Sequence, residues 1–308
     1  MTFHIVINPF GASGRALAEW HRVEEILEKR TIDYKVYFSS RQQPIDAICR
    51  RLTTTEEVVY LLIIGGDGTM NEALNGIVNV EKVRLGYIPA GSGNDLAKGL
   101  GLVEDTEALL NIILQGYVHR SVDIGVATYR CEQHFQSRRF FVGCGIGFDA
   151  EICHRVLFGW WKKLLNKCGL GKFVYLMVAL RLIFVSKMVP VSISYDDESI
   201  FYNRCLFAVT MNHPYEGGGF QFCPSAVNND GRLEVMTVND IHRWMIFRVF
   251  PKAYHGTHLS FKGIGMKSGK HIVVRTQTPM WLHTDGEVLG MTDEVTIETQ
   301  AEQLQLLM

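Results

Sequence analysis

The sequence predicts two domains: an N-terminal α/β domain with a doubly wound parallel sheet, and a β-rich, sandwich-like C-terminal domain with a helical insertion. The chain has 308 residues, about twice the length of an average domain. Residues 1–125 alternate short apolar runs with helical patterns, whereas residues 126–299 consist mainly of short β-rich runs separated by Gly, Asn and Asp. The last residues, 300–308, are compatible with either domain, and the sequence leaves open whether they return to complete the first.

In the N-terminal part, strands and helices alternate as a doubly wound sheet requires. Residues 58–64 are seven consecutive apolar residues, which is typical of a strand buried on both faces. Ligands bind such sheets beyond the carboxyl ends of the strands. The predicted elements are strands at 3–7, 34–38, 58–64 and 84–88 and helices at 16–29 and about 44–52.

The C-terminal part is predicted to be an antiparallel, sandwich-like structure. Its predicted strands are 140–145, 191–195, 205–211, 233–238, 271–276 and 295–299. One helical stretch, at about 150–188, interrupts them. Its apolar part, 173–189, is short for a bilayer span and contains Arg181 and Lys187, so we expect a buried or interfacial helix.

Composition excludes several classes of protein. The 31 basic and 32 acidic residues sum to a formal charge of −1, which disfavours a nucleic-acid binder. A hydrophobic content of 47% indicates a folded core rather than a disordered chain. The seven cysteines form no CxxC pair, which argues against a zinc site and a secreted disulfide framework. The first residues do not resemble a signal peptide, so we expect a reduced, cytoplasmic protein.

The strongest functional signal is a glycine loop, Gly65-Gly66-Asp67-Gly68-Thr69, directly after the buried strand. Its glycines let backbone N–H groups approach a ligand, and the next helix directs its N-terminus to the same place, which suits a phosphate. The negative charge of Asp67 would repel an anion, but a carboxylate at this position could orient a metal ion, a water molecule or an attacking hydroxyl group. A plain strand-to-helix turn is the alternative. Two further loops, 8–15 and 89–95, follow other strands, and no GxxxxGK[ST] motif occurs.

At these residues the chain resembles the diacylglycerol kinase catalytic-domain family, whose bacterial lipid kinases are related to sphingosine and ceramide kinases. Four motifs occur in order: the loop at 8–15, the glycine loop with Asn71-Glu72, the loop at 89–97, and Asp285-Gly286-Glu287. A lone glycine loop of this kind is shared with NAD kinases and phosphofructokinases, whereas the set of four is specific. The resemblance implies a phosphofructokinase- and NAD-kinase-like N-terminal domain with a nucleotide between the two domains.

The resemblance also implies site residues for ATP-dependent, Mg²⁺-assisted transfer of the γ-phosphate to a lipid hydroxyl. Carboxylates that hold Mg²⁺ and accept a proton suit this chemistry. The implied catalytic group is acidic, with Asp67, Asp285 and Glu287 as candidates for the proton acceptor. Without the resemblance, a hairpin turn would be the preferred interpretation of residues 285–287. The implied ATP contacts are Asn8, Ser39, Gly66, Asp67, Gly68, Thr69, Met70, Asn71, Glu72 and Ser92.

A further segment, 223–233, matches the family as well. The resemblance implies a Mg²⁺ held there by Asp230 and the main-chain carbonyls of Val227 and Arg232. Some family members have a second acidic ligand in this loop, where this chain has Asn228 and Asn229. A weak or empty metal site and a plain tight turn therefore both stay open.

An acid-free stretch indicates contact with a membrane. Residues 152–195 contain no Asp or Glu and carry a formal charge of +7. Anionic membrane surfaces favour the combination of interfacial tryptophans and lysines found at Trp160, Trp161, Lys162 and Lys163. We expect peripheral membrane contact at these residues. A core helix with a solvated basic face is the alternative.

The leading hypothesis is a cytoplasmic, peripherally membrane-associated lipid kinase of phospholipid metabolism. A kinase of a soluble metabolite such as NAD and a non-catalytic nucleotide- or lipid-binding protein are the alternatives. The acceptor lipid is not specified, because acyl-chain pockets are built from interchangeable apolar residues. A homodimer is compatible with the sequence. Histidines such as His283 show no metal-ligand spacing and are predicted to be structural.

Overall fold

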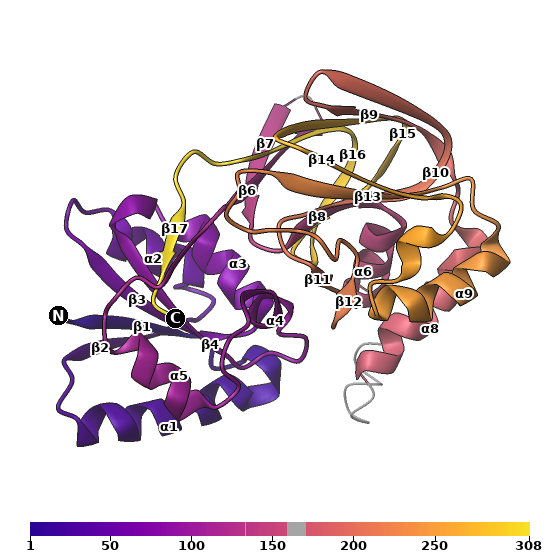
Figure 1. Cartoon of the computed structure of the whole chain (residues 1–308). Coiled ribbons are helices and arrows are strands. Elements are labelled where there is room, and N and C mark those ends of the chain that lie inside the picture. Colours follow the sequence, from indigo (N-terminus) through magenta and orange to yellow (C-terminus); the bar gives the residue numbers. More distant parts are fainter. Residues whose placement is uncertain (133, 159–170) are drawn as a thin grey trace.

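The computed structural model describes residues 1–132, 134–158 and 171–308. The described chain forms two domains that lie side by side, each built on one large sheet (Figure 1). The strand order of the N-terminal sheet is β2-β1-β3-β4-β17-β5, and its first five strands are parallel. Its last strand, β5, is antiparallel to β17, so this sheet is mixed and mostly parallel.

The helices of the N-terminal domain cover both faces of its sheet. Leu61 and Ile63 of β3 share a buried cluster with α2 and α3, while Leu62 and Ile64 share another with α1 and α5. This alternation explains the uninterrupted apolar run of β3. The elements are β1 (Phe3–Ile7), η1 (Gly11–Gly14), α1 (Arg15–Lys29), β2 (Tyr34–Phe38), α2 (Ile45–Thr53), β3 (Val59–Gly65), α3 (Asp67–Gly76), η2 (Val80–Lys82), β4 (Val83–Pro89), α4 (Asp95–Leu100), α5 (Thr106–Ile113), β5 (Arg120–Val122) and β17 (Leu304–Leu306).

The C-terminal domain is a nine-stranded sheet that folds over itself. Its two longest strands, β10 (Glu198–Met211) and β15 (His271–Thr284), pair with β8 at one end and with β9 at the other. The sheet therefore forms two layers, as a sandwich does. The other elements are β6 (Gly125–Cys131), β7 (His134–Phe140), β8 (Gly143–Gly147), α6 (Phe148–Phe158), α8 (Gly171–Val185), β9 (Val189–Tyr195), β11 (Tyr215–Glu216), β12 (Phe220–Gln221), β13 (Leu233–Asn239), α9 (Arg243–Tyr254), η3 (His258–Ser260), β14 (Ile264–Gly269) and β16 (Glu287–Thr299).

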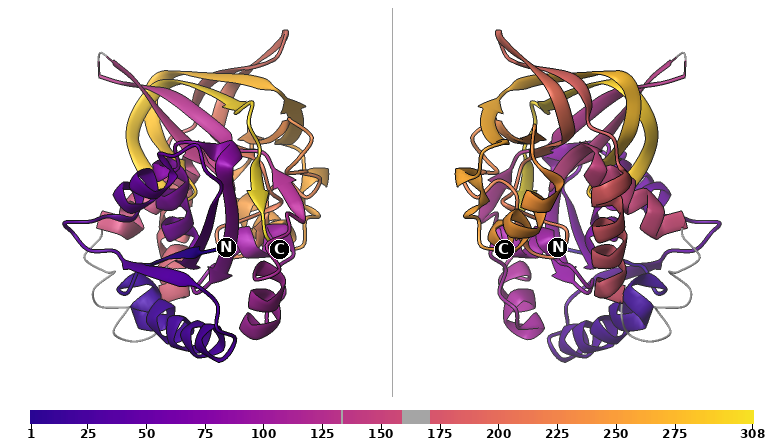
Figure 2. Two further views of the ribbon diagram at one scale, coloured as in Figure 1. Left: turned by 90° about the vertical axis from the view of Figure 1, so that its left-hand side faces the viewer. Right: turned by 90° about the vertical axis from the view of Figure 1, so that its right-hand side faces the viewer.

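The last residues of the chain return to the first sheet. Leu304–Leu306 forms β17, which pairs in parallel with β4 and antiparallel with β5. Both chain ends consequently lie in the N-terminal domain (Figure 2). The side chains of Leu304, Leu306 and Leu307 are buried, so this strand is part of the core.

Two expectations for the C-terminal domain were wrong in detail. The single strand predicted at 140–145 is broken at Phe141 and Val142, because both backbone N–H groups donate to the carboxylate of Asp285. The helix α9 was not predicted. Its aromatic and β-branched residues and Pro251 conceal a helical pattern that packing against α8 stabilises.

Candidate active site

The ends of four parallel strands bring several predicted site residues to one edge of the N-terminal sheet. Asn8 follows β1, Ser39 follows β2 and Gly66 follows β3, while Ser92 follows β4. Because the strand order is β2-β1-β3-β4, these four positions lie next to one another along the edge. β2 lies on one side of β1 and β3 lies on the other, so the strand order reverses at β1. Ligands bind in such sheets at this reversal, beyond the carboxyl ends of the strands.

The glycine loops after β3 and β4 approach each other closely. The Gly66 and Gly91 backbones are so near that a Cβ on Gly91 would lie 2.8 Å from the Cα of Gly66. The Ala90 N–H donates to the Gly65 carbonyl at 2.7 Å and ties the loops together. The first N–H groups of α3 have no partner within the helix. The loop pair therefore presents backbone donors at the sheet edge, as an anion requires.

Asp67 lies at this edge and receives two hydrogen bonds from the start of α4. Its Oδ2 accepts the N–H of Asp95 at 3.2 Å, and its Oδ1 accepts that of Leu96 at 3.3 Å. Burial, together with the nearby Asp95 carboxylate, raises the pKa of Asp67 to about 6. This carboxylate can therefore gain or lose a proton close to neutral pH.

Glu287 comes from the C-terminal domain and reaches the glycine loop. A Cβ on Gly68 would lie 3.2 Å from Glu287 Oε1, so this position leaves room for the carboxylate. Burial and the nearby Glu287 raise the pKa of Glu72 in the same helix. The fold thus brings Asp67 and Glu287 to the same end of α3 from two different domains.

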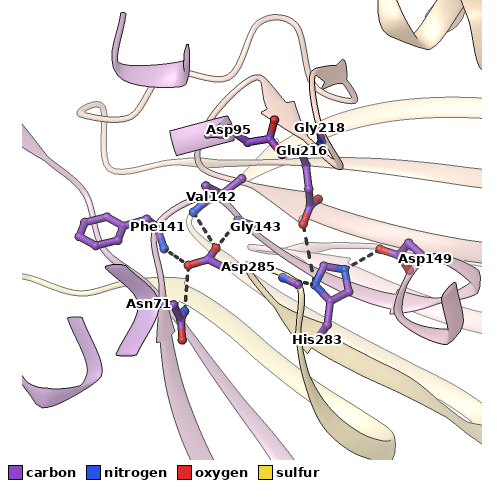
Figure 3. Close-up of polar contacts among 11 residues, drawn as sticks. Asn71, Asp95, Phe141, Val142, Gly143, Asp149, Glu216, Gly218, His283 and Asp285 are labelled. Carbon is purple, nitrogen blue, oxygen red and sulfur yellow. Dashed lines mark hydrogen bonds and ion pairs between the residues drawn. The ribbon is translucent and has the colours of Figure 1, made fainter. Parts of the chain in front are cut away.

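Asp285 is enclosed by hydrogen-bond donors (Figure 3). Its Oδ1 accepts the N–H groups of Val142 and Gly143, at 2.8 and 3.0 Å. Its Oδ2 accepts the Phe141 N–H and the Asn71 side-chain amide, each at 2.9 Å. Burial raises the pKa of Asp285, and these four donors oppose the rise. With both oxygens occupied, the carboxylate joins the β15–β16 turn to the 141–143 loop and to α3.

The acidic motif at residues 285–287 forms the hairpin turn that the sequence also allowed. Asp285 and Gly286 have φ angles of 49° and 82°, which is the conformation of a two-residue hairpin turn between β15 and β16. The paired strands shift register between Leu282 and His283, so a bulge lies next to the turn. Bulges of this kind re-aim side chains and are common beside active sites.

Apart from Asp67 and Glu72, which are described above, the predicted ATP contacts divide into two groups. Asn8, Ser39, Gly66, Gly68 and Ser92 lie at the sheet edge or in the first turn of α3. The side chains of Thr69, Met70 and Asn71 are instead buried, and that of Asn71 holds Asp285 and accepts a hydrogen bond from Arg138 at 2.7 Å. These three side chains are therefore part of the packed interior beneath the loop and hold it in place.

The loop with Asp230, Val227 and Arg232 is held by Asp123 and, among the described residues, forms no hydrogen bond with the acidic group. Asp123, a buried residue before β6, accepts the Gly231 N–H at 2.8 Å and fixes the loop. Asp230 is exposed and accepts the N–H of Arg232 at 3.0 Å, as in a plain turn. This single carboxylate is a weak ligand set for Mg²⁺, and a metal ion at this loop stays a prediction.

Sequence reasoning gave no role at the site to four titratable groups that lie close to it: Asp95, Asp149, Glu216 and His283, the last of which it predicted to be structural. Asp95 occurs in the loop motif after β4, and its Oδ2 accepts the Gly218 N–H at 2.7 Å. The other three come together from α6, β11 and β15 (Figure 3). Only Asp95 had a local signal, because the other three meet through long-range contacts.

The oxygen ligands at the sheet edge suit Mg²⁺. Within the described ranges Asp95 Oδ1 is buried without a hydrogen-bond partner, and Lys98 Nζ lies 3.7 Å from it. A Cβ on Gly93 would be 3.4 Å from an Asp67 oxygen and 3.5 Å from an Asp95 oxygen, so the two carboxylates flank the same glycine. No group of three or more His, Cys, Asp and Glu residues among those described is placed to hold a metal. Phosphate oxygens commonly complete a site with one or two carboxylates.

The residues predicted to contact a membrane, Trp160, Trp161, Lys162 and Lys163, lie outside the described residues. Over the described ranges, no helix combines the length and the apolar character needed to cross a bilayer. The helix predicted at 173–189 is observed as α8, which packs against α6 and α9.

Family comparisons cover nearly the whole chain. A model of the diacylglycerol kinase catalytic domain matches residues 2–127, and a model of the YegS C-terminal NAD kinase beta sandwich-like domain matches residues 147–308. The chain is 25% identical to the putative lipid kinase YtlR of Bacillus subtilis over 294 residues, which cover 93% of each protein. It is 27% identical to the diacylglycerol kinase of Bacillus subtilis over 292 residues, which cover 93% of this chain and 90% of that protein.

Solved structures agree with the fold. A putative diacylglycerol kinase from Bacillus anthracis has a TM-score of 0.72 at 21% identity, covering 99% of this chain and 96% of that chain. An NAD kinase from Archaeoglobus fulgidus in complex with ATP has a TM-score of 0.54 at 12% identity, covering 100% and 94%. The predicted fold class, an NAD-kinase-like α/β domain followed by a β-rich domain, is confirmed.

Proposed function

Because this chain belongs to the diacylglycerol kinase catalytic-domain family, a family of lipid kinases that use ATP, we propose that it transfers the γ-phosphate of ATP to the hydroxyl group of a lipid. The family membership agrees with the resemblance carried by the four sequence motifs. The observation that best supports the proposed reaction is the position of Glu287 against Gly68, beside Asp67. Each domain then contributes a carboxylate to the same glycine loop: Asp67 belongs to the loop, and Glu287 lies against Gly68.

The roles of the residues follow from their surroundings. The glycine loops at Gly66 and Gly91 bind the phosphates through backbone N–H groups, and Asn8, Ser39 and Ser92 lie along the same edge to contact the rest of the nucleotide. Glu287 accepts the proton of the lipid hydroxyl as that oxygen attacks the γ-phosphorus. Asp67 is the alternative acceptor, with a pKa already near neutral.

Asp285 is assigned a positioning role, since its oxygens are occupied by four donors. It fixes the turn from which Glu287 extends. Asp67 and Asp95 would hold Mg²⁺, which when bound would neutralise charge on the phosphates.

The direct test is transfer of labelled γ-phosphate from ATP with Mg²⁺ to an acceptor panel. The panel contains diacylglycerol, phosphatidylglycerol, a sphingoid base and ceramide in mixed micelles, with NAD as a soluble acceptor. Asp67→Asn and Glu287→Gln are measured beside the wild type, and Asp105→Asn is the control, because Asp105 caps α5 and belongs to none of the predicted site motifs.

We expect a labelled lipid with wild type and control, and a loss of about 100-fold or more in both site variants. Label on NAD alone would replace the proposal by a soluble-metabolite kinase. Nucleotide binding without any labelled acceptor would favour a non-catalytic nucleotide- or lipid-binding protein.

We further propose that the surface of α8 and α9 docks on an anionic membrane. Phe184 of α8 and Trp244 of α9 are exposed, and their rings are 5.3 Å apart. Exposed basic residues flank them, and neither helix contains an acidic residue. Aromatic rings between basic side chains favour the interface of an anionic bilayer. The basic residues are Arg181, Arg248 and Lys252.

A further inference from the structure

We propose that His283 is a positioning residue, which holds the turn before Glu287 through the backbone N–H of Gly286. This inference rests on the proposed function, because it concerns the placement of the proposed proton acceptor. His283 lies near the end of β15, two residues before the turn. Its side chain is 2% exposed, so the ring is enclosed by protein on all sides.

Both ring nitrogens of His283 have partners. Nε2 lies 3.1 Å from Asp149 Oδ2 of α6, and the Gly286 N–H donates to Nδ1 at 3.1 Å. A nitrogen that accepts an N–H carries no proton itself, so Nε2 bears the ring proton and donates it to Asp149. The imidazole therefore links the Gly286 backbone in the turn to Asp149 of α6.

Glu216 faces the same ring, with its Oε1 3.8 Å from Nδ1. Neither of its oxygens has a hydrogen-bond partner among the described residues. Burial raises the pKa of Glu216 to about 8, whereas the facing carboxylates raise that of His283 to about 9. The Gly286 N–H at Nδ1 requires a neutral imidazole, and a Glu216 that keeps its own proton at neutral pH adds no negative charge that would favour the imidazolium. A neutral acid also explains how this carboxyl group tolerates a site without donors.

Glycines of β8 provide the space that this arrangement needs. Gly145 pairs with His283 across the sheet, and a Cβ on Gly145 would overlap both His283 Nε2 and Asp149 Oδ2. Two residues earlier on the same face, a Cβ on Gly143 would lie 3.3 Å from Glu216 Oε2. Any larger residue at position 145 would therefore separate the histidine from Asp149.

The turn is consequently held from two sides. The carboxylate of Asp285 fixes it to residues 141–143, and His283 fixes the next residue through the Gly286 N–H. Glu287 follows directly and has its carboxylate at Gly68. Loss of the Gly286 contact frees one side of the turn, so that Glu287 moves relative to the glycine loop.

Two substitutions separate the functions of the two ring nitrogens. In His283→Asn, the amide oxygen takes the place of Nδ1 and can still accept the Gly286 N–H. In His283→Gln, the amide nitrogen takes the place of Nε2, so the Asp149 contact is kept and the Gly286 acceptor is lost. His258→Gln is the matched control, because His258 is equally buried but contacts the Phe222 carbonyl.

The assay measures kcat and KM for ATP with the labelled lipid, together with hydrogen–deuterium exchange at Gly286. We expect His283→Gln to lose about 10- to 100-fold in kcat with KM changed less than about twofold, and His283→Asn to stay within about threefold of wild type. Gly286 should exchange about 10-fold faster or more in His283→Gln, and at the wild-type rate in His283→Asn and the control.

Equal impairment of the Asn and Gln variants would mean a merely structural histidine and would overturn the proposal. So would a control that loses as much kcat as His283→Gln. If the wild type transfers no phosphate, the proposed function fails, and the Gly286 exchange rates alone decide whether His283 holds the turn. Equal rates in all variants would then reject it.

Discussion

Asp67 is proposed to act in the reaction as a carboxylate, although its burial and the nearby Asp95 disfavour the charged form. Its pKa is raised from 3.8 to about 6, so the folded protein holds the proton more tightly than the unfolded chain does. Below about pH 4 Asp67 is protonated in both states, and its ionisation costs the folded state nothing. As the pH rises through 6, the carboxylate ionises in its buried site and the free energy of unfolding falls. We predict that Asp67→Asn abolishes phosphate transfer but raises the free energy of unfolding at pH 7.5 by about 1–2 kcal/mol. The rise in pKa sets an upper limit of about 3 kcal/mol on this gain. The gain is smaller because an amide oxygen accepts the N–H groups of Asp95 and Leu96 less strongly than a carboxylate does.

Urea unfolding at pH 7.5 and pH 4.5 checks this prediction, since the gain should fade at the lower pH. Asp196→Asn is the control with the opposite sign. Two backbone N–H groups lower the pKa of Asp196, so its ionised form stabilises the fold and its replacement should weaken the protein at neutral pH. An Asp67→Asn protein that is less stable than wild type at both pH values would contradict the argument.

At the scale of the element, the β15–β16 hairpin is the unit that joins the domains at the site. Asp285 takes three backbone N–H groups and the Asn71 amide, and replacing it with alanine leaves four buried donors without an acceptor. Each such donor costs about 1–3 kcal/mol, so Asp285→Ala should lower the free energy of unfolding by about 3 kcal/mol or more. Asp285→Asn keeps one acceptor oxygen and should lose less.

Urea unfolding compares these variants with Asp105→Ala, which removes the carboxylate that caps α5 through one N–H from Ala108. Loss of a single cap costs about 1 kcal/mol. If Asp285→Ala were no more damaging than the Asp105 variant, the four contacts would not hold the hairpin.

At the scale of the whole molecule, one buried apolar cluster runs through both domains, from Met70 and Leu85 to Val142 and Val209. The α8–α9 surface belongs to the same body as the site (Figure 1). We predict that Trp244→Ala and Arg248→Glu each weaken binding to vesicles that contain phosphatidylglycerol. A basic residue near an anionic surface contributes about 1 kcal/mol, so the charge reversal should cost about 10-fold or more.

Co-sedimentation with vesicles of phosphatidylcholine, with and without phosphatidylglycerol, measures this effect. Phe135→Ala is the control, because Phe135 is also an exposed aromatic residue but lies on the β6–β7 hairpin. Binding that is independent of anionic lipid, or equal losses in all three variants, would reject the docking surface.

The sequence by itself determined the strands and helices that flank the glycine loops and their succession along the chain. Apolar alternation and glycine punctuation are local signals, so β1 to β4 and the loops after β1, β3 and β4 could be located before any contact was known. The four motifs identified the family for the same reason. They named Asp67 and Glu287 but did not show that Glu287 lies against Gly68, the residue after Asp67.

Only the tertiary structure decided what each acidic residue contacts. Asn71 bonds to Asp285 across 214 positions of sequence and Gly143 across 142, and no local pattern encodes such pairs. The same holds for His283, which meets Asp149 only when β15 packs against α6. The Asn71 contact depends on how the two domains dock, and the other two depend on how the C-terminal sheet folds. A buried carboxylate takes whichever donors the packed backbone presents.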